Sequence, residues 1–327
     1  MTSRRNRVQQ VLDVTSREAA ELGRIERREI FIVLRQAEGE LSDGLREWLK
    51  NAPDGGSRFT AQQMRNALAN VRVAMQTIRS MDPLMAGALE SIRRDSGKLA
   101  LSHVESQLLE FSQIFEGTLK PVNIRVAAAF ARGEKLLIRK HAKSARRYAG
   151  EMEKHIRRQL MKGVLKGESF EQMALRLSRL APNQLVTLST DPADQMARGL
   201  MQLPRSSASR IIRTEAIEAY NTFHHAGIED LAEDDDDIRK RWDSTLDRRG
   251  CQTCRKLDGQ VRKVDEDFEM NGREYKHPTA HPHCRCTVVP WAESWKHDSM
   301  QSTGTEAIDA PDPKPFTPRS KERAPAK

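Results

Sequence analysis

Apolar positions in the first half of the chain recur at steps of three and four residues, the spacing of one face of an α-helix. The first stripe consists of Val8, Leu12, Thr15, Ala19 and Leu22. A second stripe ends where Pro53-Asp54-Gly55-Gly56 interrupts the pattern. It consists of Ile30, Val33, Leu34, Ala37, Leu41, Leu45, Trp48 and Leu49. Both patterns predict long amphipathic helices that pack against one another.

The helical pattern continues beyond this break. After Asp82-Pro83 a further stripe presents Leu101, Val104, Leu108, Phe111 and Phe115. Pro121 restarts the pattern as a long helix that extends to about Lys166, and another helix is predicted over residues 208–231. Such stripes are typical of packed helix bundles, and they indicate nothing specific about a ligand.

The sequence pattern changes near Arg241 from helical periodicity to turn and strand signals. Leu257-Asp258-Gly259-Gln260 and Met270-Asn271-Gly272-Arg273 are both typical of tight hairpin turns, and residues 260–264 have strand character. After Trp295 the chain is rich in Ser, Thr, Asp, Pro and Lys, a composition that predicts disorder.

These patterns predict an α+β protein that is mostly α. Long helices form the N-terminal half, and a C-terminal helix precedes a small β-hairpin module. We expect an extended helical arm over residues 1–130, a domain over 131–298 with its Cys/His hairpin module at 239–292, and a disordered tail over 299–327.

Basic residues are concentrated in one stretch of the chain. The formal net charge is +9, and residues 132–166 alone contain twelve Lys or Arg against three Glu. A basic helix face attracts nucleic-acid phosphates without reading sequence; the alternative is an ordinary solvated helix face. The candidate DNA-binding residues are Arg139, Lys140, Lys143, Arg146, Arg147, Lys154, Arg157 and Arg158.

Neither a secretion signal nor a membrane span is expected. The basic residues 2–7 are not followed by an apolar segment. The longest apolar run, residues 126–131, is far shorter than the ~20 residues that a membrane helix needs. We therefore expect the protein to start out in the cytosol, where clustered cysteines favour a metal site over disulfides.

All four cysteines lie within residues 251–286. Cys251 and Cys254 form a C-x-x-C pair, and the second cluster is His281-Pro-His283-Cys284-Arg-Cys286. A C-x-x-C pair on a tight turn presents two thiolates to one ion, and hairpins can bring the second cluster back to it. The predicted zinc ligands are Cys251, Cys254, His281 and Cys284, with Cys286 or His283 as substitutes. The thiolate forms are favoured by nearby Arg248, Arg249, Arg255 and Arg285.

A catalytic zinc would need an open position for water and a nearby base. The candidate bases are Asp243, Asp247, Glu215 and His283. The sequence contains no HExxH, GxxxxGK[ST] or GxSxG motif, so peptidases, P-loop ATPases and α/β-hydrolases find no support. We predict a structural zinc that holds hairpins with little core of their own, in a protein that is not an enzyme. A zinc-dependent nuclease or other nucleic-acid-modifying enzyme is the alternative.

Short motifs follow one another in a recognisable order along the C-terminal half. They are Arg213-Thr214-Glu215, Trp242-Asp243-Ser244, Asp247, Cys251-x-x-Cys254, Leu257-Asp258-Gly259 and His281-Pro-His-Cys284-Arg285-Cys286. In this order they resemble the phage Mu F-like head morphogenesis family, over roughly residues 135–292. The motif residues with an expected structural role are Arg213, Glu215, Trp242, Asp247, Asp258, Gly259 and Arg285.

The resemblance implies a minor capsid protein inside the phage head, near the portal, that supports capsid assembly and DNA packaging or ejection. It implies the portal protein as a partner, with the scaffold or major capsid protein as further candidates, and non-specific contact with packaged double-stranded DNA. The expected location is the virion, after assembly in the host cytoplasm. About 35 residues follow Pro290, too few for a fused folded enzyme. A cellular zinc-ribbon regulator is a third interpretation, which the Arg213-Thr214-Glu215 helix disfavours.

Overall fold

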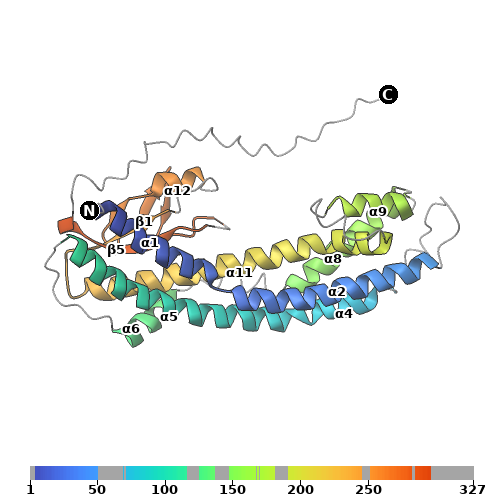
Figure 1. The fold of residues 1–327 in the computed structure, drawn as a ribbon, viewed down its shortest axis with the longest axis horizontal. Coiled ribbons are helices and arrows are strands. Elements are labelled where there is room, and N and C mark those ends of the chain that lie inside the picture. Colours follow the sequence, from blue (N-terminus) through green and yellow to red (C-terminus); the bar gives the residue numbers. More distant parts are fainter. Residues whose placement is uncertain are drawn as a thin grey trace, which may run out of the picture.

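The protein is an elongated helical bundle with a small β-module at one end (Figure 1). The computed structural model describes residues 4–50, 69, 71–115, 125–136, 147–166, 168, 170–180, 191–244, 251–281 and 284–295. The predicted disordered tail, residues 299–327, lies outside the described residues. The predicted fold class, mostly helical α+β with long N-terminal helices and a small antiparallel sheet, is confirmed.

The longest described helix is α11 (Pro192–Ala232), which has 41 residues and runs through the bundle (Figure 1). Asp191 caps it by accepting a 2.8 Å hydrogen bond from the N–H of Ala193. Pro192 takes the first position, where a missing N–H costs no helical hydrogen bond. The sequence predicted a start at residue 208, but the helix already includes Pro204, whose carbonyl accepts a hydrogen bond from the buried Tyr148 hydroxyl.

The other helices pack around α11. The contacts of α5 and α2 with it are the most extensive, and α6 and α9 also lie against it. The bounds are α1 (Arg4–Glu21), α2 (Arg24–Lys50), α4 (Arg72–Arg79), α5 (Met81–Phe115), α6 (Val126–Leu136), α8 (Tyr148–Leu165) and α9 (Phe170–Ser178). None of the described helices is long and apolar enough to span a membrane.

The predicted apolar stripes form the core. In α2 the buried members of the stripe are Ile30, Leu34, Ala37, Leu41, Leu45 and Trp48. They join α4, α8, α9 and the first half of α11 in one cluster. A second cluster contains residues of α1, the end of α5, the end of α11 and the β-module. The core therefore continues from the helices into the module.

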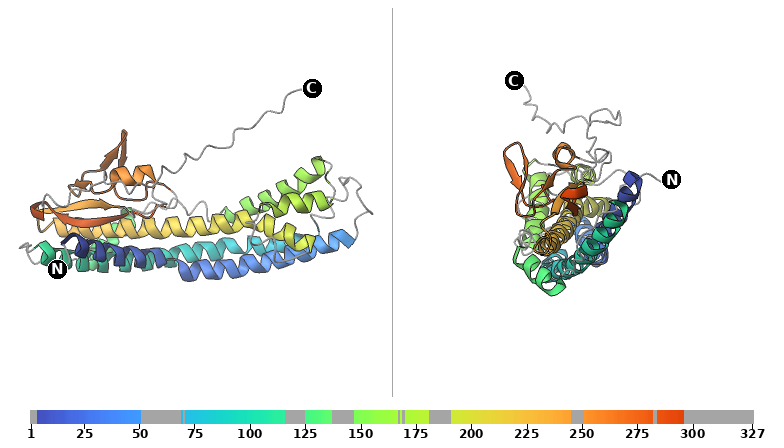
Figure 2. Two further views of the ribbon diagram at one scale, coloured as in Figure 1. Left: turned by 45° about the horizontal axis from the view of Figure 1, so that its top comes forward. Right: turned by 90° about the vertical axis from the view of Figure 1, so that its left-hand side faces the viewer.

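The β-module consists of two small antiparallel sheets. One has the strand order β2-β1-β5 and the other pairs β3 with β4. The elements are β1 (Ile238–Asp243), α12 (Gln252–Leu257), β2 (Val261–Arg262), β3 (Phe268–Met270), β4 (Arg273–Tyr275), β5 (Thr287–Ala292) and the short 3-10 helix η1 (Glu293–Trp295). Figure 2 shows this module on one side of α11, with α1, α2 and α5 on the opposite side.

Of the two predicted hairpin turns, one forms as expected. Met270 pairs with Arg273 across a two-residue turn, in which Asn271 and Gly272 have φ of 53° and 70°. The other prediction was wrong in kind. The residues before Gly259 form the helix α12, so Gly259, at φ 75°, ends a helix and leads into β2. Glycine adopts this left-handed conformation without the strain of a side chain.

The predicted boundary between arm and domain, at residues 130 and 131, falls inside α6. Helices from the predicted arm share both main clusters of the core with α11. The division of the chain into an arm and a domain therefore stays a prediction about folding units, and the structure places the two parts side by side in one bundle.

Two glycines in long helices provide a matched test of this packing. A Cβ on Gly199 of α11 would lie 1.9 Å from the carbonyl oxygen of Leu177 in α9, whereas a Cβ on Gly39 of α2 would have no neighbour within 4 Å. We expect Gly199→Ala to lower the free energy of unfolding by about 1–3 kcal/mol through overpacking. Gly39→Ala should raise it by roughly 0.5–1 kcal/mol through helix propensity.

The measurement is equilibrium denaturation of both variants by urea. Equal stabilisation by both substitutions would contradict the close approach of α9 to α11.

Candidate metal centre

The first two predicted ligands lie at the start of α12. Cys251 is the N-cap residue, and its Sγ accepts a 3.3 Å hydrogen bond from the N–H of Cys254 in the first helical turn. His281 comes from the loop between β4 and β5, and its Nε2 lies 3.0 Å from Sγ of Cys251 and 3.1 Å from Sγ of Cys254. The C-x-x-C pair therefore sits on a helical turn, with the imidazole across from both sulfurs.

Cys284 and Cys286 approach the same place from the chain that leads into β5. The Sγ atoms of Cys254 and Cys284 are 3.8 Å apart. The donor atoms of Cys251, Cys254 and His281 lie within 4.8 Å of one another, and so do those of Cys254, Cys284 and Cys286. Cys254 is common to both groups. The structure thus brings together the predicted ligands and one substitute; the other, His283, lies outside the described residues.

The surroundings favour the thiolate form of two cysteines. Burial raises the pKa of Cys251, but hydrogen bonds from Cys254 and the nearby charge of His281 outweigh it and lower the pKa overall. Hydrogen bonds from the thiols of Cys254 and Cys286 lower the pKa of Cys284, while the same contact with Cys284 raises the pKa of Cys254. Because the thiolate is the form that binds metal, the group is prepared for a cation.

The residues present fit a zinc ion. Sulfur and imidazole nitrogen are the donors that zinc prefers in structural sites, and two sulfurs on a tetrahedral zinc are about 3.8 Å apart. The Sγ–Sγ distance of 3.8 Å between Cys254 and Cys284 agrees with that spacing. The pair is buried, as a closed structural site requires.

Three of the predicted motif residues surround this group. Ser244 Oγ donates a 2.7 Å hydrogen bond to the carbonyl of Cys254 and accepts a 3.1 Å bond from the indole N–H of Trp242. The carboxylate of Asp258 accepts from the N–H of Ser244 at 2.8 Å, and the N–H of Gly259 donates to the carbonyl of Trp242 at 2.8 Å. These bonds tie α12 to the end of β1 and thereby position Cys254.

A buried amide joins the metal group to α11, and the sequence reasoning missed it. The Nδ2 of Asn221 donates to the carbonyl of Cys286, and its Oδ1 accepts from the N–H of Val288, both at 2.9 Å. Asn221 shares a helix face with the buried Ile217 and Ile228. A polar residue at that spacing was the available signal, because a buried amide needs hydrogen-bond partners.

The two charged residues of the Arg213-Thr214-Glu215 motif point in opposite directions. Glu215 is buried, and its Oε1 lies 2.5 Å from the guanidinium of Arg93 on α5. Arg213 is exposed. Glu215 is therefore held in the helical core by Arg93, and the proposal that it is a base at the metal centre finds no geometric support. Asp247 lies outside the described residues.

A buried lysine next to the module was also missed. Nζ of Lys240 on β1 donates to the carbonyl of Lys276 at 2.8 Å and lies 3.1 Å from Nε2 of His225 on α11. Burial lowers the pKa of Lys240 to about 8, and it lowers the pKa of the neighbouring His277 to about 4. Lys240 and the buried Trp242 are two positions apart on β1, so their side chains lie on the same face of the strand. This spacing was the signal that Lys240 faces inward.

The predicted basic helix is described only in part, as α6 and α8. Four of its candidate DNA-binding residues lie outside the described residues, namely Arg139, Lys140, Lys143 and Arg146. On α8, Lys154 pairs with Glu151 at 3.2 Å, and Arg157 pairs at 2.9 Å with Glu153, which Arg79 also contacts. Arg147 and Arg158 are exposed, and neither forms an ion pair with a carboxylate within the residues that the structure describes.

Comparison with known proteins agrees with the motif order. Residues 154–289, roughly two fifths of the chain, match the family model described as "Phage Mu protein F like protein". This segment contains most of α8, all of α11 and the candidate metal centre. The predicted resemblance to the Mu F-like phage head morphogenesis family is confirmed.

A curated protein also matches in part. The NAD(+)–arginine ADP-ribosyltransferase EFV of Enterococcus faecalis (strain ATCC 700802 / V583) is 25% identical over 149 residues, which cover 44% of this chain and 26% of that protein. The match thus spans about a quarter of the length of that relative. No solved structure matches the chain at a significant level.

The metal group leads to a test by substitution. We expect the purified chain to hold one zinc, and Cys254→Ala to lose it, because Cys254 belongs to both donor groups. Loss of a structural zinc should cost about 3 kcal/mol or more, which corresponds to roughly 6–12 °C in Tm for a unit of this size. Cys286→Ala, the matched control, should keep the metal.

Metal content by mass spectrometry and thermal unfolding check both expectations. Loss of zinc from Cys286→Ala together with its retention in Cys284→Ala would contradict the favoured ligand set. Full metal content and an unchanged Tm in Cys254→Ala would contradict the centre itself.

The buried ion pair leads to a second test. We expect Glu215→Ala to lower the free energy of unfolding by about 3–5 kcal/mol, because it leaves the charge of Arg93 buried without its partner. The double variant Arg93→Met/Glu215→Leu should recover most of that loss. Arg213→Ala, in the same motif but exposed, should stay within roughly 0.5 kcal/mol of the parent. Denaturant unfolding measures all three, and a double variant as unstable as Glu215→Ala would contradict the account.

Proposed function

We propose that this chain is a virion structural protein, a minor component of a phage head that lies inside the capsid near the portal. The match of residues 154–289 to the Mu F-like family carries this proposal. The matched segment includes α11 and most of the β-module, which share a core and are joined through Asn221. A rigid unit of this kind suits a part built into an assembly.

We propose zinc as the ion of the metal centre, in a structural role. The strands β2, β3 and β4 have two or three residues each, and α12 has six. Elements this short are not stable on their own. Ligands from α12 and from the chain before β5 would be held by one ion, which closes the module without requiring a larger core.

We propose that the shared part of this chain does not carry a transferase activity. The name of the curated relative describes an NAD-dependent arginine ADP-ribosyltransferase, and the match covers about a quarter of that protein. In the part of this chain that resembles the family, two buried polar side chains are engaged in bonds within the fold. Glu215 pairs with Arg93 and Asn221 bonds to the chain at β5.

The partners follow from the family. We propose contact with the portal protein, and with the scaffold or major capsid protein, during assembly in the host cytoplasm. We also propose non-specific contact with packaged DNA that supports packaging or ejection. On α8, Arg147 and Arg158 support this contact, while Lys154 and Arg157 would exchange a glutamate for a phosphate.

The test is quantitative mass spectrometry of purified virions from the phage that encodes the chain. We expect the protein in the particle at far fewer copies than the major capsid protein, and heads that lack it should assemble or package DNA poorly. Its absence from the particle, with normal heads in its absence, would overturn the proposal.

A nuclease assay with the zinc-loaded protein separates the alternative function. DNA cleavage that is lost in Asp247→Ala or His283→Ala would favour a zinc-dependent nuclease. Intact DNA, with binding that depends on salt, is the result expected of a structural protein.

A further inference from the structure

A pocket lies between α2 and α11, in the half of the bundle remote from the metal centre. The two helices run antiparallel, since Arg46 of α2 contacts Asp191 and Asp194 at the start of α11, whereas Glu38 contacts Arg205 further along it. The pocket has a volume of about 590 Å³. Its lining combines apolar surface with five charged residues, namely Arg35, Glu38, Asp194, Arg198 and Arg205.

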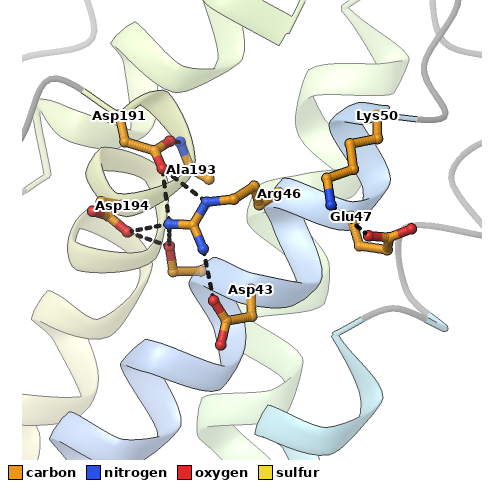
Figure 3. Close-up of polar contacts among 8 residues, drawn as sticks. Asp43, Arg46, Glu47, Lys50, Asp191, Ala193 and Asp194 are labelled. Atoms are coloured by element: carbon orange, nitrogen blue, oxygen red, sulfur yellow. Dashed lines mark hydrogen bonds and ion pairs between the residues drawn. The ribbon is translucent and has the colours of Figure 1, made fainter.

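The carboxylates of this pocket already have cationic partners. Figure 3 shows Arg46 between Asp191 and Asp194, with N–O distances of 2.8 Å and 3.1 Å. Asp194 also accepts a hydrogen bond from Ser42. Glu38 lies 2.5 Å from the guanidinium of Arg205 and 3.9 Å from that of Arg198. One carboxylate thus faces two arginines at the centre of the pocket.

Three further arginines of the two helices, Arg27, Arg35 and Arg213, are not engaged in this way. Arg35 is exposed at the rim of the pocket. Arg27 lies eight residues before Arg35 on α2, close to Arg213 of α11. Burial, and then repulsion from Arg213, lower the pKa of Arg27. Within the residues that the structure describes, no carboxylate lies within 4 Å of the guanidinium of Arg27, Arg35 or Arg213. Together with Arg198 and Arg205 of the pocket, these three arginines form a row along the two helices. We call the five residues Arg27, Arg35, Arg198, Arg205 and Arg213 the arginine seam.

The spacing of the arginine seam suits a polymer of phosphates. Arg198, Arg205 and Arg213 recur at seven and eight residues, so they follow one side of α11. At 1.5 Å per residue the first and last of them are roughly 22 Å apart along the helix. That length corresponds to about six base pairs of duplex DNA at 3.4 Å each.

The arginine seam also differs from the basic helix that the sequence singled out. On α8, Lys154 and Arg157 already pair with glutamates on the same helix. Arg27, Arg35 and Arg213 of the seam give up no carboxylate within the described residues, and a phosphate between Arg27 and Arg213 would also relieve the repulsion between them. Arginine moreover binds phosphate through two parallel N–H groups.

We propose that the arginine seam binds the phosphate backbone of duplex DNA. Arg27, Arg35 and Arg213 make the contacts, and Arg198 and Arg205, which pair with Glu38, add positive charge beside them. The inference rests on the proposed function only in taking packaged DNA as the partner. It assigns a role to Arg213, the outward residue of the Arg213-Thr214-Glu215 motif, while Glu215 anchors the same helix turn in the core. Recognition of this kind is independent of base sequence.

The experiment measures the binding of a fluorescently labelled duplex to the purified full chain across a series of salt concentrations. The test variant is Arg35→Ser/Arg213→Ser. The matched control is Arg72→Ser/Lys98→Ser, which removes the same charge from exposed positions on α4 and α5, outside the arginine seam. Thermal unfolding of each variant establishes that it is folded.

We expect the test variant to bind the duplex at least tenfold more weakly than the parent at low salt. Its plot of log affinity against log salt should lose about two units of slope, roughly 0.9 for each phosphate contact removed. The control should stay within about threefold of the parent, through its smaller effect on the overall field.

Four results would overturn the proposal. One is an equal loss in the control, which would make the effect one of net charge. Another is parent-like binding by the test variant together with loss in Arg147→Ser/Arg158→Ser, which would place the contact on α8. A third is displacement of the duplex by polyglutamate at equal charge, which would indicate an acidic protein segment. The last is stabilisation by inorganic phosphate without duplex binding, which would indicate a small anion.

These results are separate from those that test the proposed function. A chain found in the virion whose test variant binds duplex normally refutes the arginine seam alone. A chain that binds duplex through the seam but is absent from the virion refutes the structural role alone.

Discussion

The burial of α11 on nearly every side is the constraint on which the rest of the structure depends. A helix of 41 residues that passes through two clusters of the core must be covered along its whole length. α2, which runs antiparallel to α11, and α5, which runs parallel to it, cover one side, and the β-module covers the other near the C-terminal end (Figure 2). Each polar residue on the covered faces needs a partner, because an unpaired polar group in a core costs free energy.

Those polar partners connect the parts of the fold. Glu215 binds Arg93 and so sets α5 against α11. Six residues later Asn221 bonds to both sides of the chain at the start of β5 and sets the module on the helix. Further along α11, His225 contacts Lys240 of β1. The helix α11 thus orients the bundle and the metal centre relative to each other. Within the β-module, short neighbouring elements are then enough to bring the metal ligands together.

The two charged regions of the molecule serve different purposes in this account. Around the metal centre, three of the four cysteines are buried, and a zinc ion would balance the charge of their thiolates. Between α2 and α11 the arginines remain near solvent, and Arg27 and Arg213 repel each other, which is stable only while water or an anion screens them. The proposed assembly unit and the proposed DNA contact therefore lie on different parts of one rigid helix, as a protein in contact with both capsid and genome would need.

The sequence by itself determined the helical class, the stripes that form the core, the Met270-Asn271-Gly272-Arg273 turn and the set of donor residues. These features follow from local periodicity and spacing, which the chain carries without reference to distant residues. The family resemblance was equally available, because the order of the motifs is a property of the sequence alone.

Only the tertiary structure decided the start of α11 at Pro192, the helix before Gly259, the partners of Glu215 and Asn221, and the inward side of Lys240. Each depends on a residue far away in the chain. Arg93 and Glu215 are separated by 122 positions, and Asn221 and Cys286 by 65. The arginine seam has the same origin, because its members come from two helices that become neighbours only when the bundle closes. Sequence spacing gives the order of such groups, whereas packing decides which of them meet.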